Sequence, residues 1–222
     1  LKLRGWNWGR WGLTQPTDAA ENAAQGATCV RIPLRWWGYY ETPGVDSRDD
    51  GQPGTAGIDA GHLAILDAMV AQASAAKLWI ILFIDSDCGQ NGTQDAHEVA
   101  YCDPKGEYPN GHNFWTDPGV RARFINVWKF VAARYRDTPY LGLFEPLPEP
   151  NPTSGTDADI RAFYDEVMMA LRTVAPGVPF LLGPRSYGMK SVEAAYTSKW
   201  TDVVYTGNLF LRTSGTHDEN IA

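Results

Sequence analysis

The feature that most constrains the fold is a regular alternation of short apolar runs with amphipathic segments of helical length. The apolar runs have the length of β-strands and occupy residues 1–8, 27–33, 78–84, 141–147, 178–182 and 203–205. The segments between them show helical periodicity, and we expect helices over residues 18–25, 63–73, 118–135, 157–174 and 191–200. Such alternation predicts an α/β fold of about six β-α units, in which helices cover a parallel sheet.

Two architectures fit this alternation, an open doubly wound sheet and a closed (β/α)8 barrel. The open sheet usually carries a glycine-rich phosphate turn after its first strand. Here the segment from Gly5 to Gly12 holds Trp6, Trp8 and Trp11, whose side chains would obstruct a phosphate. The long polar loops follow strands, which is where a barrel places its functional loops. We therefore favour the barrel, with residues 1–222 as a single domain because no shift in composition divides the chain.

The length is short for a complete barrel. Eight units of this size would need roughly 300 residues, and the sequence has 222. We expect an incomplete barrel, which either a C-terminal part outside this sequence or a partner chain would complete.

Composition excludes several classes of function. The net charge is −7 and no run of Lys and Arg is present, so we expect no nucleic-acid partner. No apolar run reaches 18 residues, which predicts no membrane span. The four histidines are scattered along the chain, so we expect no catalytic metal and no cofactor; they are His62, His97, His112 and His217.

The three cysteines do not show the paired spacing of a zinc site. Cys88 and Cys102 flank a polar loop, where they form either a disulfide or two free thiols. Cys29 lies in an apolar run and is expected to be a small buried side chain. An acidic, Trp-rich chain with a possible disulfide favours a secreted protein.

Carboxylates and aromatic rings follow the predicted strands, where a barrel gathers its site. This set comprises Arg31, Trp36, Trp37, Asp85, Asp87, Glu145, Glu149, Arg185, Tyr187, Asn208 and Phe210. The chain is rich in such rings, with nine Trp, ten Tyr and eight Phe. Aromatic faces stack on sugar rings, and a protonated carboxyl can protonate a glycosidic oxygen. The pattern predicts a carbohydrate site at the barrel mouth.

Glu149 is the sharpest candidate for catalysis. It follows an apolar strand, between Pro148 and Pro150, and apolar neighbours would disfavour its ionised form, which suits a proton donor. The alternative is a turn glutamate that faces solvent. Arg31 could hold a carboxylate by a forked pair of hydrogen bonds, or it could form a structural ion pair.

Other assignments have less support. Trp36 and Trp37 either contact a ligand or pack their loop against the barrel rim. Asp85 and Asp87 lack the further clustered oxygen ligands that calcium needs. No Gly-x-Ser-x-Gly elbow is present, which leaves serine hydrolase chemistry without support.

Several segments, taken in order, resemble glycoside hydrolase family 5, the cellulase and mannanase family of retaining barrels. They are Leu3-Arg4-Gly5-Trp6-Asn7, the run from Gly26 to Pro33 that contains Val30-Arg31-Ile32-Pro33, Gly89-Gln90-Asn91-Gly92, the helix from Phe124 to Pro139, Pro148-Glu149-Pro150, Val203-Val204-Tyr205 and Thr216-His217. The resemblance covers most of the chain.

The resemblance implies a role for each candidate. Glu149 would be the acid/base, and Arg31 would hold the nucleophile carboxylate, which belongs on a seventh strand beyond Ala222. Trp36, Trp37 and Tyr187 would line sugar subsites. The chain departs from the family at Pro148, where an Asn is usual, at Asp85, where a His is common, and at Asn208 and Phe210, where a His and a Tyr are usual.

The leading hypothesis is a retaining glycoside hydrolase that acts on a β-linked polysaccharide or oligosaccharide. The departures at Pro148, Asp85 and Asn208 keep open a non-catalytic carbohydrate-binding barrel. A different barrel enzyme such as an aldolase would need a lysine at a strand end, and only Lys190 is remotely placed.

Overall fold

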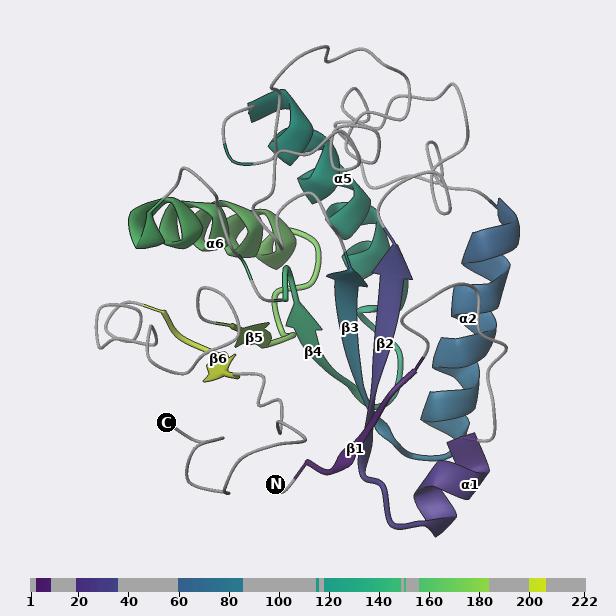
Figure 1. The fold of residues 1–222 in the computed structure, drawn as a ribbon. Coiled ribbons are helices and arrows are strands. Elements are labelled where there is room, and N and C mark those ends of the chain that lie inside the picture. The colour runs from purple at the N-terminus through teal and green to yellow at the C-terminus, as the bar shows by residue number, and fades with distance from the viewer. Residues whose placement is uncertain are drawn as a thin grey trace, which may run out of the picture.

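The computed structural model describes residues 3–8, 19–35, 60–85, 115, 118–148, 150, 156–183 and 200–206. The strands in this part of the chain are β1 (Gly5–Asn7), β2 (Cys29–Arg35), β3 (Trp79–Asp85), β4 (Leu141–Glu145), β5 (Phe180–Leu182) and β6 (Val203–Tyr205). All neighbouring pairs are parallel, in the order β1-β2-β3-β4-β5-β6 (Figure 1). A doubly wound sheet reverses its strand order at a switch point. The sequential order therefore confirms the predicted barrel topology.

The described helices are α1 (Ala19–Ala24), α2 (Ala60–Ala75), α5 (Pro118–Tyr135) and α6 (Asp157–Arg172). Figure 1 shows α2, α5 and α6 around the outside of the twisted sheet. α2 contacts β2 and β3, while α5 packs against α6. These helices match the predicted segments, whereas residues 191–199 of the helix expected over 191–200 lie outside the described residues. No helix in the described ranges has both the length and the apolar character to cross a bilayer.

The sequence of α6 shows why these segments are helical. Its buried side chains recur at spacings of three and four and make one apolar stripe; they are Ile160, Phe163, Tyr164, Val167, Met168 and Leu171. At the start of the helix the Asp159 carboxylate accepts hydrogen bonds from Thr156 N at 2.6 Å and Thr156 Oγ1 at 2.8 Å. The Thr156 backbone bond is the main reason that the pKa of Asp159 is lowered. The ionised acid also interacts favourably with the positive end of the helix dipole.

The sheet has a packed core on each face. On the outer face Ile32, Leu82, Phe144 and Phe180 are at most 1% exposed and belong to the large cluster with the helices. On the inner face a separate small cluster contains Ile81, Leu143 and Leu181. Burial on both faces explains why the central strands read as continuous apolar runs.

A close contact joins the chain before β1 to the turn before β2. Gly26 follows α1 with φ +86°, a left-handed conformation that favours glycine. Arg4 donates to the Gly26 carbonyl oxygen from Nε at 3.0 Å and from Nη2 at 2.7 Å. In β1 itself, a Cβ at Gly5 would lie 1.7 Å from the Cys29 carbonyl oxygen. Glycine is therefore required at position 5 for β1 to pair with β2 at this distance.

Two strands, β2 and β4, end two residues away from their predicted C-terminal ends. β2 continues through Pro33 to Arg35, since burial of Ile32 and Leu34 outweighs the one ladder hydrogen bond that a proline cannot make. Arg31 therefore lies inside β2 and not at its exit. β4 ends at Glu145, two residues earlier than predicted, because Pro146 begins a proline-rich segment.

Candidate functional site

Arg31 and Glu145 lie on the inner face of the sheet. In the strand register Arg31 aligns with Ile81, and Glu145 aligns with Phe83. Aligned residues of parallel strands share a face, as do residues two apart on one strand. Since Ile81 belongs to the inner cluster, all four side chains point away from the helices.

Arg31 and Glu145 form a bidentate ion pair. Arg31 Nε donates to Glu145 Oε2 at 2.5 Å, and Arg31 Nη2 donates to Glu145 Oε1 at 2.8 Å. The side chain of Glu145 is 3% exposed, and that of Arg31 is 20% exposed. The fork satisfies both carboxylate oxygens in the stronger, charge-assisted form of hydrogen bond. The pair therefore fixes the plane of the guanidinium.

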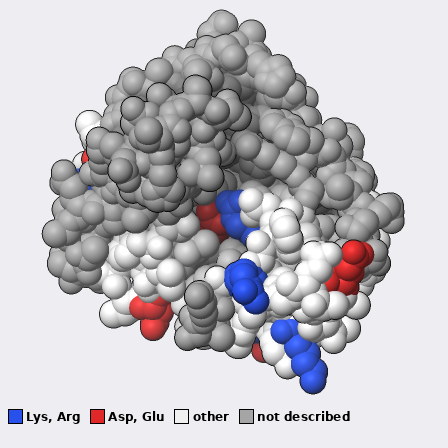
Figure 2. Space-filling view, turned by 60° about the horizontal axis from the view of Figure 1, so that its bottom comes forward, with Lys and Arg blue, Asp and Glu red and all other residues white. Residues whose placement is uncertain are grey.

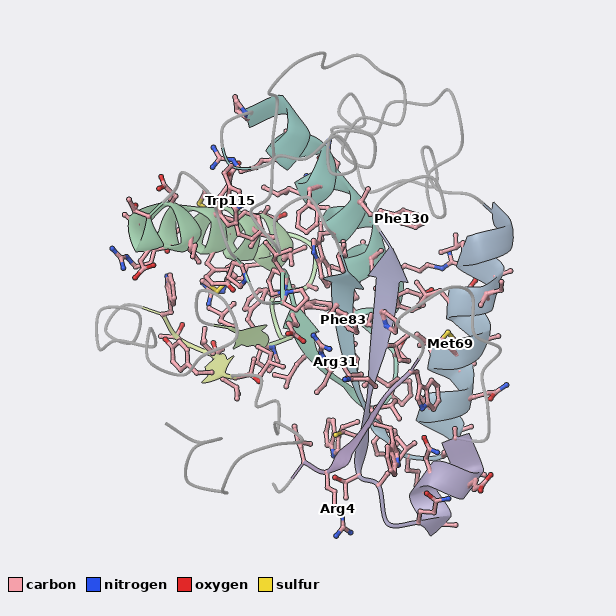
Figure 3. The ribbon with its side chains drawn as sticks, viewed as in Figure 1. Arg4, Arg31, Met69, Phe83, Trp115 and Phe130 are labelled. Atoms are coloured by element: carbon pink, nitrogen blue, oxygen red, sulfur yellow. The ribbon has the colours of Figure 1, made fainter. Side chains whose placement is uncertain are left out.

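The ion pair spans β3, which separates the two strands that supply it. Strands two positions apart in a sheet are separated by about 10 Å, a distance that the long arginine side chain bridges. Its guanidinium carbon lies 3.6 Å from the centroid of the Phe83 ring of β3. Figure 3 shows Arg31 and Phe83 next to each other in the middle of the sheet. The ring supports the guanidinium through a cation–π contact.

The third nitrogen of Arg31 faces β1. Arg31 Nη1 donates to Asn7 Oδ1 at 3.3 Å, a long hydrogen bond. A guanidinium carries five N–H groups, and the bonds to Glu145 and Asn7 use three of them. The remaining hydrogens on Nη1 and Nη2 are the ones that Arg31 could offer to a ligand or to a further carboxylate.

The charges of the described residues stand in small groups on the face that Figure 2 presents, including an acidic and a basic group in contact near its centre. They do not gather there into a patch of one sign.

The structure describes some of the candidate residues and leaves others outside the described ranges. Arg31 is placed as above, and Asp85 is the last residue of β3, although its side chain is outside the described set. Cys29 is buried, as predicted, and burial raises the pKa of its thiol. The other candidates lie outside the described residues; they are Trp36, Trp37, Asp87, Cys88, Cys102, Glu149, Arg185, Tyr187, Asn208 and Phe210. Pro148 and Pro150, on either side of Glu149, are both buried.

From the sequence, Glu145 was expected among the residues that follow the strands, but no partner was predicted for it. The alternation along β4 was the available signal, because it puts Glu145 on the same face as Leu143. Asn7 and Phe83 were not predicted to contact Arg31. No group of three or more His, Cys, Asp or Glu that could hold a metal occurs within the described ranges.

A second arginine–carboxylate pair lies on the outer side, between α2 and α5. Arg134 donates to Asp67 from Nε at 2.8 Å and from Nη2 at 2.6 Å, and the Tyr135 hydroxyl donates to Asp67 Oδ1 at 2.8 Å. The bond from Arg134 holds the pKa of Asp67 below its usual value, and burial raises the pKa of Tyr135. These groups border an open groove of about 630 Å³.

The sequence model of the cellulase family, glycosyl hydrolase family 5, matches residues 2–207. No curated protein matches the chain. Among solved structures, the endoglucanase Cel5A of the hyperthermophile Thermotoga maritima superposes with a TM-score of 0.65 at 20% identity, over 91% of this chain and 59% of that one.

Two further structures are similar to the chain. A glycoside hydrolase has a TM-score of 0.67 at 19% identity, over 93% of this chain and 59% of its own. A tri-modular endo-β-1,4-glucanase of subfamily 4 from Bacillus licheniformis has a TM-score of 0.64 at 16% identity, over 91% of this chain and 37% of its own. At these identities the likeness establishes the fold, a (β/α)8 barrel. The chain spans 59% or less of the length of these three proteins.

Proposed function

Since the chain belongs to glycosyl hydrolase family 5, we propose that it forms part of a retaining glycosidase that cleaves a β-linked polysaccharide or oligosaccharide. The observation that carries this proposal is the family match over residues 2–207. The inner-face ion pair supports it, since it joins Arg31 of β2 to Glu145, the last residue of β4, which lies four residues before Glu149 in the sequence. The named endoglucanases among the similar structures support a β-linked glucan as the first substrate to test.

Glu149 is the proposed acid/base. In the first step its protonated carboxyl donates to the leaving glycosidic oxygen, while a carboxylate nucleophile attacks the anomeric carbon and forms a glycosyl ester. In the second step the Glu149 carboxylate takes a proton from water, and the water oxygen displaces the nucleophile. This mechanism needs two carboxyls about 5–5.5 Å apart. We propose that the nucleophile lies on a seventh strand beyond Ala222.

Glu145 has a described carboxylate on the inner face of the sheet, but it is unsuited to the role of proton donor. It is 3% exposed, and its two oxygens accept from Arg31. A guanidinium at this distance stabilises the ionised form of a carboxylate. We assign Glu145 to hold Arg31, whose remaining N–H groups would orient the nucleophile.

The other residues have proposed roles in binding. Trp36, Trp37, Tyr187 and Phe210 would offer aromatic faces to sugar rings, and Asp85 and Asn208 would accept or donate hydrogen bonds to hydroxyls. In the described residues β1 pairs with β2 alone and β6 with β5 alone. We propose that further strands, from the rest of the protein or from a second chain, pair with these edges.

Release of reducing ends from soluble β-1,4-glucan and β-mannan by the intact protein tests the proposal. Glu149→Gln should lower hydrolysis about 10²- to 10⁴-fold, the usual contribution of a general acid. Glu166→Gln is the matched control, because Glu166 is a half-exposed glutamate of α6 on the helical side. Hydrolysis by Glu149→Gln at the wild-type rate would remove Glu149 from the mechanism.

One observation favours a second candidate, a non-catalytic carbohydrate-binding barrel. Pro148 stands where the family has an asparagine, and proline has no donor for a sugar hydroxyl. Calorimetry with cello- and manno-oligosaccharides separates the candidates. Heat of binding without release of reducing ends favours the binding barrel, and turnover favours the hydrolase.

A further inference from the structure

The backbone between β4 and Glu149 is unusually poor in hydrogen-bond donors. Residues 146, 148 and 150 are all proline, so only Leu147 and Glu149 carry a backbone N–H in this segment. The chain here can be tied to its surroundings chiefly through its carbonyl oxygens. Those oxygens are buried with the segment, since Pro146, Leu147 and Pro148 are all buried.

An indole of α5 binds the first of these carbonyls. Trp128 Nε1 donates to the Pro146 oxygen at 2.9 Å, and Trp128 is 0% exposed. Its ring stands edge-on to Phe144 of β4, with ring centroids 5.6 Å apart and an interplanar angle of 66°. The contact with Phe144 fixes the orientation of the indole, and the indole in turn fixes the carbonyl that follows β4 by one residue.

A phenol of α6 binds the second carbonyl. The Tyr164 hydroxyl lies 3.3 Å from the Leu147 oxygen and 3.0 Å from the Gly183 oxygen, so its single proton is shared between them. Gly183 follows β5 directly, which means that Tyr164 joins the ends of two neighbouring strands. Tyr164 is 0% exposed and packs edge-on against Trp200, with an interplanar angle of 88°.

We propose that Trp128 and Tyr164 are positioning residues, which fix the proline-rich segment after β4 and thereby place the carboxyl of Glu149 for proton transfer. This inference rests on the proposed role of Glu149. The prolines remove N–H groups with which the segment could bind its surroundings, and donors on α5 and α6 bind its carbonyl oxygens instead. Misplacement of a reacting group by about 1 Å can reduce a rate about 100-fold, so the loss of one anchor should affect proton transfer first.

Tyr164→Phe removes one hydroxyl and keeps the ring. The readout is kcat/KM on two substrates, a cello-oligosaccharide and a 2,4-dinitrophenyl β-cellobioside, whose leaving group departs without a proton. We expect kcat/KM to fall about tenfold to 100-fold on the oligosaccharide and to stay within about twofold on the dinitrophenyl substrate. A structural role alone would lower both values equally.

Tyr135→Phe is the matched control. Tyr135 is a buried tyrosine whose hydroxyl binds Asp67 on the outer side, away from the segment after β4. It should leave the ratio of the two kcat/KM values unchanged. Trp128→Phe is a second variant that should shift the ratio in the same direction as Tyr164→Phe, and thermal unfolding checks that each variant is folded.

The possible failures are distinguishable. Equal loss on both substrates in folded Tyr164→Phe, or no loss on either, overturns the positioning role while Glu149→Gln still discriminates between the substrates. The proposed function fails if Glu149→Gln leaves the ratio of the two kcat/KM values unchanged, or if the intact protein turns over neither substrate. The positioning role then fails with it.

Discussion

Two arginines of this chain hold a carboxylate through the same fork, one on the inner face of the sheet and one on the outer helices. Nε and Nη2 donate to the two oxygens in both, at 2.5 and 2.8 Å for Arg31 with Glu145 and at 2.8 and 2.6 Å for Arg134 with Asp67. The geometries are nearly equal, but Glu145 is 3% exposed and Asp67 is 38% exposed.

The difference in exposure decides what each pair contributes. An exposed pair is screened by water and salt and typically contributes about 0–1 kcal/mol to stability. Two charges taken out of water lose hydration that their attraction barely repays, so a buried pair adds little net stability. Removing one partner of a buried pair, by contrast, leaves the other charge buried without a counter-charge. The inner pair is therefore better explained by the position it gives Arg31 than by stability.

The largest expected effect is on the inner pair. Glu145→Ala should lower the free energy of unfolding by about 3–5 kcal/mol, because it leaves the Arg31 guanidinium without its carboxylate. Urea unfolding of the intact protein measures this change. A loss below about 1 kcal/mol would mean that water or another group replaces Glu145, and the two pairs would then be energetically alike.

Replacing both inner partners sharpens the distinction between stability and function. The double variant Arg31→Met with Glu145→Leu should regain an unfolding free energy within about 1–2 kcal/mol of the wild type, since packed apolar side chains commonly replace a buried pair without loss. Hydrolysis should nevertheless remain lost, because no guanidinium is left to orient the nucleophile. Recovery of activity together with stability would contradict the role given to Arg31.

The outer pair should respond much less. Asp67→Asn is expected to lower the free energy of unfolding by no more than about 1 kcal/mol and to leave hydrolysis unchanged. The same urea titration at low and high salt measures it, and the difference from wild type should shrink as salt rises. An effect as large as that of Glu145→Ala would show that exposure does not set the energy of these forks.

The smallest effect is the pH dependence of the outer pair. Arg134 lowers the pKa of Asp67 in the folded chain relative to the value of about 3.9 in the unfolded chain. The stabilisation is therefore complete above about pH 4 and is lost as the pH falls through the folded value. The difference in unfolding free energy between wild type and Asp67→Asn should be constant from pH 5 to 8 and should decrease below pH 4. A difference that grows on acidification would contradict this sign.

Local sequence patterns predicted the sheet and its helices because each pattern depends on burial within one element. The stripe on α2 and the doubly buried run of β3 are examples. The ends of β2 and β4 were misplaced because a proline inside a buried strand and a proline after it look the same in sequence. Pro33 lies within its strand, and Pro146 follows one.

The inner pair could be predicted only in part. Arg31 was expected to hold a carboxylate, but Glu145 lies 114 residues away on a strand that is not adjacent. Their contact depends on the register of three strands and on the Phe83 ring between them. Trp128 likewise lies in a segment that was predicted to be helical, but the hydrogen bond of its indole depends on where α5 packs.

The most direct test of the central claim is the product that Glu149→Ala forms from a 2,4-dinitrophenyl β-cellobioside in the presence of azide. A retaining barrel with Glu149 as acid/base should accumulate its glycosyl ester, which azide attacks without general-base help, and proton NMR should show β-cellobiosyl azide. Formation of the α-azide, or wild-type hydrolysis of β-1,4-glucan by this variant without any azide product, would contradict the account.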